Sequence, residues 1–403
     1  MHASSPSSPP SPPPSPTPPP SSPRGFLVHH GRAGIKDARP DFAVIASEVP
    51  AATSAVFTRS RFAGPSVRMS REAAADRITR GVVVLSGNAN VATGEGGRQD
   101  AEEIRGQVAA ALGADPNDVL IASTGVIGHR YPMPLLRRHV ASLRWPFPGA
   151  DFAAAATAIM TTDTHPKIRR AHCGDATLIG IAKGVGMMEP DMATLLTFFC
   201  TDAEVGPVVL DDIFRRVMDR TFNALSIDTD TSTSDTAAVF ANGLAGPVDL
   251  MEFERTLGAL ALDLVKDIAR DGEGATKLIE VRVTGARDTA QAKRVAKAVV
   301  NSPLVKTAVH GADPNWGRVA MAVGKCQDDL DIVPERVTID FGGQEVYPGT
   351  PGPDELARVA AHLKLAEVEL RVDLGHPHSA AEFTAYGCDL TEGYVRLNAD
   401  YST

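Results

Sequence analysis

The peptide bond between Ala193 and Thr194 joins a small residue to a threonine that opens an apolar run. If this bond were cut, Thr194 would carry a free α-amine beside its own hydroxyl group. An α-amine has a reference pKa of about 8, so an appreciable fraction is neutral at neutral pH and can take the hydroxyl proton. Such a residue is nucleophile and base at once and is suited to acyl transfer. Without the cut, Thr194 is expected to be a core threonine at the start of a strand.

Acyl transfer passes through tetrahedral oxyanions, which need hydrogen-bond donors that are already in place. Thr124 and Gly125 follow a short apolar run, residues 119–122, that predicts a buried strand. A glycine at this position lets the backbone approach a reacting carbon closely. The pair is a candidate oxyanion hole, although Ser-Thr-Gly taken alone is usually only a turn.

Spaced carboxylates between Asp228 and Asp235 could suggest a loop that binds a cation. The run lacks the glycine and the terminal glutamate of an EF-hand loop. We therefore assign no metal site to it.

The composition argues against several classes of partner. The chain has 403 residues, a net charge of −9 and no block of lysines and arginines, which argues against nucleic acid or an anionic membrane. No apolar run approaches the length of a transmembrane helix. The cysteines, Cys173, Cys200, Cys326 and Cys388, are scattered, as expected for free thiols in a reducing cytoplasm.

Helical and strand-like patterns alternate along the chain, which favours α/β layers. Strands are expected at residues 81–86, 119–122, 194–199, 278–283, 337–341 and 368–372. Helices are expected at residues 100–112, 151–160, 211–223, 250–269, 291–300 and 353–362. Asp100 is the predicted N-cap of the first of these helices, with Glu103 as its capping-box partner.

Motifs spread over the whole chain occur together in a fixed order. They are residues 55–59, 86–90, 123–128, 160–164, 183–197, 271–277, 302–308, 311–318 and 389–398. On this ordered set the chain resembles the ornithine acetyltransferase (glutamate N-acetyltransferase) family from Arg24 to Thr403. Glu189 and Asp191 stand where the arginine-pathway members usually carry His and Asn. With Val91-Ala92-Thr93, they look like the paralogue found in clavulanic acid gene clusters.

The resemblance implies that the chain cleaves itself between Ala193 and Thr194. It also implies a layered αββα-like core with a smaller C-terminal α+β domain. Residues 1–23 are a Ser/Pro-rich tail that we expect to be disordered. The product before the cut is called the α chain and the product after it the β chain. Residues 24–193 would form the α chain of the core, and residues 194–320 the part of the core that the β chain supplies. Residues 321–403 would form an α+β domain that closes the site. The family pairs its two processed chains, typically as a heterotetramer with two copies of each.

The activity implied is acetyl transfer from N-acetylornithine to glutamate through an acetyl-Thr194 ester, with no cofactor. The family's oxyanion hole matches Thr124 and Gly125. Its substrate contacts match Thr161, Lys183, Thr194, Glu273, Asn398 and Thr403. The substrates carry a carboxylate and a second charged group, so we expect Lys183 to pair with the carboxylate and Glu273 with the ammonium group of ornithine.

Two other functions remain open from the sequence. A self-processing threonine amidohydrolase or aminopeptidase would use water as the acyl acceptor. A regulatory paralogue would not be processed at all.

Overall fold

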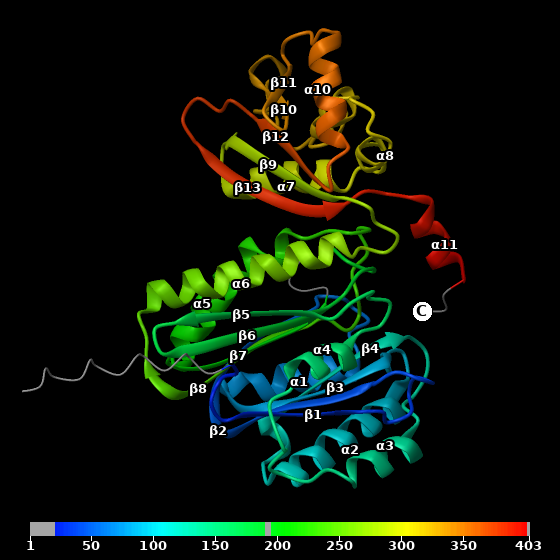
Figure 1. The fold of residues 1–403 in the computed structure, drawn as a ribbon, viewed down its shortest axis with the longest axis vertical. Helices are drawn as coiled ribbons and strands as arrows, with labels where there is room; N and C mark the ends of the chain where they lie inside the picture. Colours follow the sequence, from blue (N-terminus) through cyan, green and yellow to red (C-terminus); the bar gives the residue numbers. More distant parts are fainter. Residues whose placement is uncertain (1–20, 190–194, 401–403) are drawn as a thin grey trace, which may run out of the picture.

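The computed structural model describes residues 21–189 and 195–400 (Figure 1). Ala193, Thr194 and Thr403, which the sequence analysis singled out, lie outside the described residues, as do Asp191 and most of the Ser/Pro-rich tail. The described part of the chain forms two sheets with helices packed against them. This arrangement confirms the α/β class expected from the alternating sequence patterns.

The larger sheet has eight strands in the described residues, in the order β4-β3-β2-β8-β7-β6-β5, and β1 also pairs with β2. The strands are β1 (Phe26–Gly31), β2 (Phe42–Phe57), β3 (Ile78–Asn88), β4 (Val119–Val126), β5 (Lys167–Cys173), β6 (Ala176–Lys183), β7 (Leu196–Glu204) and β8 (Thr236–Pro247). The pairs β3–β4 and β7–β8 are parallel, and the other pairs are antiparallel.

The long strand β2 divides this sheet into two halves. Its first part pairs with β1 and β3, and its last part pairs with β8 after a register shift between Ala46 and Ala51. Helices α2 (Gly94–Leu112) and α3 (Met133–Val140) cover the outer face of the first half. Helices α5 (Pro207–Arg220) and α6 (Leu250–Arg270) cover the outer face of the second half. The result is a helix–sheet–sheet–helix arrangement.

Helix α4 (Phe152–Ile159) lies between the two halves, and α1 (Pro65–Ala73) packs beside β4. Strand β3 shows how these layers are specified, because side chains alternate between the faces of a strand. Val82 and Val84 pack into the cluster that contains α4, whereas Val83 and Leu85 pack against α2 and α3. Both faces are therefore buried, which explains the continuous apolar run in the sequence.

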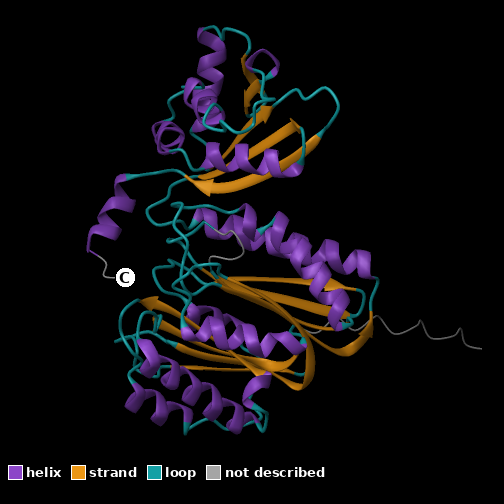
Figure 2. Cartoon of the chain, turned by 180° about the vertical axis from the view of Figure 1, so that it is seen from behind, coloured by secondary structure: helices purple, strands orange, loops and turns teal. Residues whose placement is uncertain are grey.

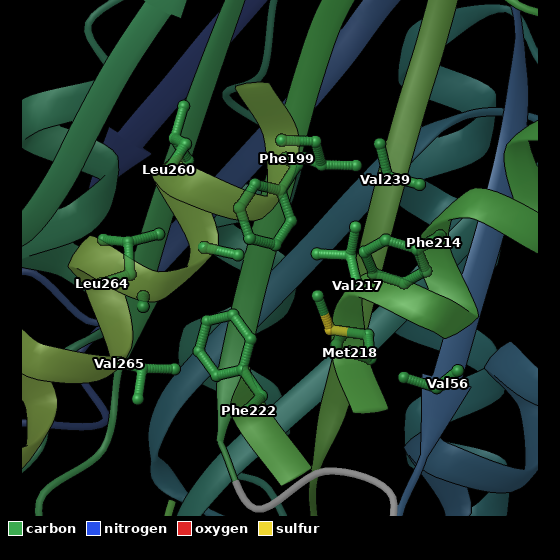
Figure 3. Close-up of a cluster of buried hydrophobic side chains, with 14 of the residues drawn as sticks. Val56, Phe199, Phe214, Val217, Met218, Phe222, Val239, Leu260, Leu264 and Val265 are labelled. Atoms are coloured by element: carbon green, nitrogen blue, oxygen red, sulfur yellow. The ribbon is translucent and has the colours of Figure 1, made fainter. Parts of the chain in front are cut away.

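Aromatic side chains fill the core between β7 and its covering helices (Figure 3). The ring of Phe199 on β7 makes edge-on contacts with Phe214 of α5 and with Phe222, each at 6.1 Å between ring centroids. This packing fixes β7, the strand that follows Thr194 in the chain.

The smaller sheet has the strand order β11-β10-β12-β9-β13. Figure 2 shows helices packed against its strands. Its strands are β9 (Leu278–Ala286), β10 (Thr338–Phe341), β11 (Gln344–Tyr347), β12 (Glu367–Asp373) and β13 (Ala381–Cys388). Its helices are α7 (Thr289–Val300), α8 (Pro303–Gly311), α9 (Gly317–Val323) and α10 (Pro353–Leu363). Because β9 pairs with both β12 and β13, this layer begins before residue 321, where we expected the α+β domain to start.

The start of α2 differs from the sequence prediction. The helix begins at Gly94 with Thr93 as N-cap, so the prediction of Asp100 as N-cap is wrong. Asp100 lies inside the helix, where its carboxylate accepts two hydrogen bonds of 2.7 Å from Arg130. Tertiary packing of the apolar helix face thus outweighs the weak helix propensity of the glycines at its start. No helix in the described part of the chain is long and apolar enough to cross a membrane.

Candidate active site

Six predicted site residues that the structure describes lie around one cavity of about 360 Å³. They are Thr124, Gly125, Thr161, Lys183, Glu273 and Asn398. The cavity also has Thr162, Gly186, Met187, Asp228, Tyr394 and the loop 230–234 in its wall. The fold therefore brings together residues that are far apart in the sequence. The other predicted positions, Ala193, Thr194 and Thr403, lie outside the described residues.

Thr124 and Gly125 reach the cavity at the end of β4. Gly125 has a φ of 127°, and a Cβ atom at this position would lie 2.3 Å from the carbonyl carbon of Gly87 on β3. Only glycine fits this close approach between two strands. The main chain is thus exposed to the cavity here without a side chain that would cover it.

Lys183 is the last residue of β6 and brings a cation to the cavity. Its Nζ atom donates a hydrogen bond of 3.1 Å to Oγ1 of Thr161. Burial lowers the pKa of Lys183, and the charges of Asp163 and Asp235 oppose that shift. The ammonium group is therefore poorly solvated, which favours an exchange of water for an anionic partner.

Glu273 supplies an anion from the turn between α6 and β9. Its carboxylate accepts hydrogen bonds of 2.8 Å from Oγ1 of Thr162 and from Nδ2 of Asn398 on α11 (Glu392–Asp400). Gly186 makes room for it, because a Cβ atom there would lie 2.5 Å from Oε2 of Glu273. Lys183 and Glu273 therefore bring a cation and an anion to the same cavity, whose wall also contains Asp228 and Asp230.

A buried ion cluster supports this wall of the cavity. Nζ of Lys167 donates hydrogen bonds of 2.8 Å to Asp163 and 2.6 Å to Asp271, and all three side chains are almost completely buried. Asp163 also accepts hydrogen bonds from the backbone amides of Gly184 and Thr161. Burial acts to raise the pKa of Asp163, but Lys167 and Lys183 outweigh it and the pKa is lowered. Asp163 thus connects the strand end at Lys183 to the loop of Thr161.

Asp228, the first residue of the acidic run, binds backbone amides. The carboxylate of Asp228 accepts hydrogen bonds of 2.7 and 2.6 Å from the amides of Met187 and Met188. It also accepts a weak hydrogen bond of 3.4 Å from the hydroxyl of Tyr394 on α11. The run therefore fixes the segment that leads toward residue 190.

Glu189 and Leu195 are the described residues that flank the segment 190–194, and both are held in place. The amide of Glu189 donates a hydrogen bond of 2.8 Å to the carbonyl of Asp230, and its carboxylate accepts from Asn301. Leu195 lines a small cavity together with Thr124, Lys183 and other residues of the candidate site. The chain therefore enters and leaves the segment 190–194 beside the candidate oxyanion hole.

Sequence reasoning missed several residues of this site. Thr162 and Asp163 lie inside the motif at residues 160–164, so that motif could have identified them. Lys167 and Tyr394 gave none, because a single lysine or tyrosine is not distinguishable from a surface residue in one sequence. Asp228 and Asp235 were noted only as possible metal ligands and set aside.

Comparison with known proteins gives matches over nearly the whole chain. Residues 27–403 match the model of the ArgJ family. "Glutamate N-acetyltransferase Oat2" of Streptomyces clavuligerus is 65% identical over 388 residues, which are 95% of this chain and 98% of that protein. "Arginine biosynthesis bifunctional protein ArgJ" of Rhodococcoides fascians is 51% identical over 385 residues, which are 95% of each chain.

Two solved structures match about half of this chain. The arginine biosynthesis bifunctional protein ArgJ of Bacillus halodurans is 38% identical and covers 50% of this chain and 96% of its own, with a TM-score of 0.46. Ornithine acetyltransferase of Mycobacterium tuberculosis, complexed with ornithine, is 36% identical and covers 43% of this chain and 94% of its own, with a TM-score of 0.40.

The matched family and the identities of the relatives define an acyltransferase, as the sequence motifs predicted. The chain belongs to the ArgJ family. Its identity to the Streptomyces clavuligerus paralogue is in keeping with the unusual residues Glu189 and Asp191.

Proposed function

We propose that this chain transfers the acetyl group of N-acetylornithine to glutamate and that Thr194, freed by self-cleavage, is the nucleophile. The observation that carries the proposal is the cavity that Lys183, Glu273 and the candidate oxyanion hole line together. Thr124 and Lys183 also line the small cavity that Leu195 reaches. The name of the Streptomyces clavuligerus relative, a glutamate N-acetyltransferase, supports the same reaction.

The first step creates the catalyst. The Thr194 hydroxyl attacks the carbonyl carbon of Ala193, the peptide C–N bond breaks, and an ester forms. Water then hydrolyses the ester and leaves chains 1–193 and 194–403 with a free α-amine on Thr194. Thr124 and Gly125 are the proposed donors to the oxyanion that develops on the carbonyl oxygen.

The second stage is a double displacement. The α-amine takes the proton of the Thr194 hydroxyl, the hydroxyl oxygen attacks the acetyl carbonyl, and ornithine leaves with a proton on its amine. The amine of glutamate then attacks the acetyl ester and restores the hydroxyl. Lys183 is the proposed partner of the substrate carboxylate, and Glu273 of the ornithine ammonium group, since both line the cavity. Thr161, Asn398 and Thr403 are the further proposed contacts.

We also propose that the two processed chains stay paired, with two copies of each in the assembly. The strand order supports the pairing of the two chains, because β7 and β8 lie between β2 and β6 in one sheet. Sedimentation analysis of the purified protein measures the number of copies.

Gel electrophoresis and intact-mass measurement test the processing step. The wild type should give two chains that meet at Ala193 and Thr194, and Thr194→Ala should remain one chain without transfer activity. Thr307→Ala, an exposed threonine that does not line the cavity, is the matched control and should be processed and active. One full-length band from fully active wild type would rule out the nucleophile proposed here.

Product analysis tests the acceptor. Wild type should release ornithine at a high rate only when glutamate is present, and N-acetylglutamate should form in equal amount. Rapid release of acetate without glutamate would instead identify an amidohydrolase, and an intact, inactive chain would identify a regulatory paralogue.

A further inference from the structure

A second cavity, of about 380 Å³, is formed by the end of β2, by α1 with the 3₁₀ turn η1 (Ala74–Asp76) that follows it, and by α5. In the described part of the chain it shares no lining residue with the candidate active site. Four of the five residues of the motif at 55–59, which the proposed function does not use, line it. Its volume lies within the range of small-molecule sites, about 300–1,000 Å³.

Positive charge dominates the wall of this cavity. Its charged lining residues are four arginines and one aspartate, namely Arg59, Arg71, Arg77, Arg215 and Asp211. Guanidinium groups stay protonated at physiological pH, so this excess of positive charge is permanent. The nearby acidic residues Glu72, Asp76 and Asp212 are exposed and do not line the cavity. The cavity is thus cationic in a chain whose net charge is −9.

Asp211 holds two of these arginines in place. Its buried carboxylate accepts hydrogen bonds of 3.3 Å from Nη2 of Arg77 and 3.0 Å from Nε of Arg215. A further hydrogen bond of 2.7 Å from Oγ of Ser54 fixes the carboxylate itself. One carboxylate does not neutralise two guanidinium groups. Each of these groups carries five N–H donors, so both keep donors for a ligand.

Arg71 is held in a different way. Its guanidinium lies over the ring of Phe57, 5.7 Å from the ring centroid, and Nη2 donates a hydrogen bond of 3.0 Å to the carbonyl oxygen of Thr58. The two contacts restrict the side chain before a ligand arrives. Such restriction lowers the entropy cost of binding. Arginines from three parts of the chain are therefore placed in advance around one cavity.

We propose that this cavity binds a small anion of the phosphate class that carries at least two negative charges. The planar fork of a guanidinium group matches two oxygens of a phosphate group, and such charge-assisted pairs are strong. A phosphate group on an organic molecule carries about −1.5 to −2 charges at neutral pH, whereas a carboxylate carries one. A phosphate therefore balances the excess of positive charge better. The site is separate from the proposed acyl transfer and does not depend on self-cleavage.

Isothermal titration calorimetry of the purified enzyme with pyrophosphate, at constant ionic strength, tests the proposal. One pyrophosphate should bind per chain, and the affinity should fall as potassium chloride is added, because salt screens the charges. Succinate, which has two carboxylates, should bind more weakly than pyrophosphate. Equal or tighter binding of succinate would overturn the assignment to the phosphate class.

Two substitutions at Ala75, an exposed lining residue of η1, place the binding in this cavity. Ala75→Glu adds a carboxylate beside the arginines and should weaken pyrophosphate binding by at least about tenfold, because like charges repel. Ala75→Gln adds the same bulk without the charge, is the matched control and should bind within about twofold of wild type. Thermal unfolding checks that both variants fold.

Arg71→Gln gives a second, independent readout, because this arginine has no ion pair with Asp211 to lose. It should weaken pyrophosphate binding by about tenfold, the usual effect of losing one charge-assisted hydrogen bond. Arg216→Gln removes an exposed arginine of α5 that pairs with Glu254 and does not line the cavity. This control should leave the binding unchanged, which separates the site from the general effect of one charge less.

Three results would overturn the proposal. The first is the absence of pyrophosphate binding to the folded wild type, which includes the case where an assembly of several copies covers the cavity. The second is binding that Ala75→Glu does not weaken, since the anion would then bind elsewhere. The third is an equal loss of affinity in Arg71→Gln and Arg216→Gln, which would indicate attraction to the surface as a whole.

Discussion

The side-chain amide of Asn398 donates a hydrogen bond of 2.8 Å to Oε2 of Glu273, although 125 residues separate the two in the chain. This bond connects α11 to the turn before β9. It orients the carboxylate that we propose to bind the substrate ammonium group.

Asn398→Ala should therefore raise the KM for N-acetylornithine or ornithine by about fivefold. That factor corresponds to about 1 kcal/mol, the usual net worth of one hydrogen bond at an accessible site. The kcat should change little, because the bond orients a binding group. Steady-state kinetics with both substrates measure the effect. Arg396→Ala, an exposed residue on the same helix, should leave the KM unchanged.

Gly186→Ala should disturb the site without unfolding the protein. The new Cβ atom would lie 2.5 Å from Oε2 of Glu273, which is the end of a flexible side chain and can rotate away. We expect a KM increase of about tenfold for the ornithine substrate, because the ammonium group loses its partner. Gly106→Ala, with no atom within 4 Å of its new Cβ, should leave the KM as it is and stabilise α2 by about 0.5–1 kcal/mol. Equal KM values for the two variants would contradict the role of Glu273.

Lys167→Met should destabilise the fold by about 3–5 kcal/mol, because it leaves Asp163 and Asp271 buried without their cation. Urea denaturation at neutral pH measures the loss. Arg98→Ala, which removes exposed ion pairs with Glu95 and Glu102, should leave the stability almost unchanged. A small effect of Lys167→Met would mean that the buried cluster does not support the cavity wall.

Acid should destabilise the chain through the contact between His29 of β1 and His139 of α3, whose Nε2 atoms lie 3.1 Å apart. Burial, and then the charge of His139, lower the pKa of His29 from 6.5 to about 4. Between these pH values the unfolded chain binds a proton that the folded chain does not, so stability falls as the pH falls. The loss should be about 1–2 kcal/mol, since His29 is only half buried and solvent screens the shift.

Denaturation of wild type and His29→Gln at pH 7 and at pH 4.5 measures this loss. The variant should lose less stability on acidification than wild type, because it has no imidazole to protonate. The same acid dependence in both proteins would show that other groups control it.

The predicted site residues that the structure describes carry a short sequence signal, and their roles stay a prediction. Thr124, Gly125, Thr161, Lys183, Glu273 and Asn398 lie in ordered motifs, and the structure places all six around one cavity. Strands β3 and β4 followed from their apolar runs, since a strand buried on both faces leaves a continuous pattern.

Features that depend on distant contacts were not visible in the sequence. The start of α2 was predicted wrongly because Asp100 was read as a helix cap. Its actual partner, Arg130, lies 30 residues away in the sequence. The strand β9 was predicted, but its place in the smaller sheet was not, since its partners β12 and β13 come late in the chain. Lys167 and Asp235 are notable because their charged side chains are buried, and a single sequence does not show which charged residues are buried.

The strand order bears on the order in which folding and cleavage occur in such an enzyme. A cut between residues 193 and 194 would leave β7 and β8 in one chain and their neighbours β2 and β6 in the other. Neither product could complete the larger sheet alone, so folding would have to come before cleavage. Unfolding of the mature enzyme would then depend on protein concentration, whereas unfolding of an uncut Thr194→Ala chain would do so only through its self-association. The cut would thus give activity to the enzyme, but the separated chains would lose the ability to refold alone.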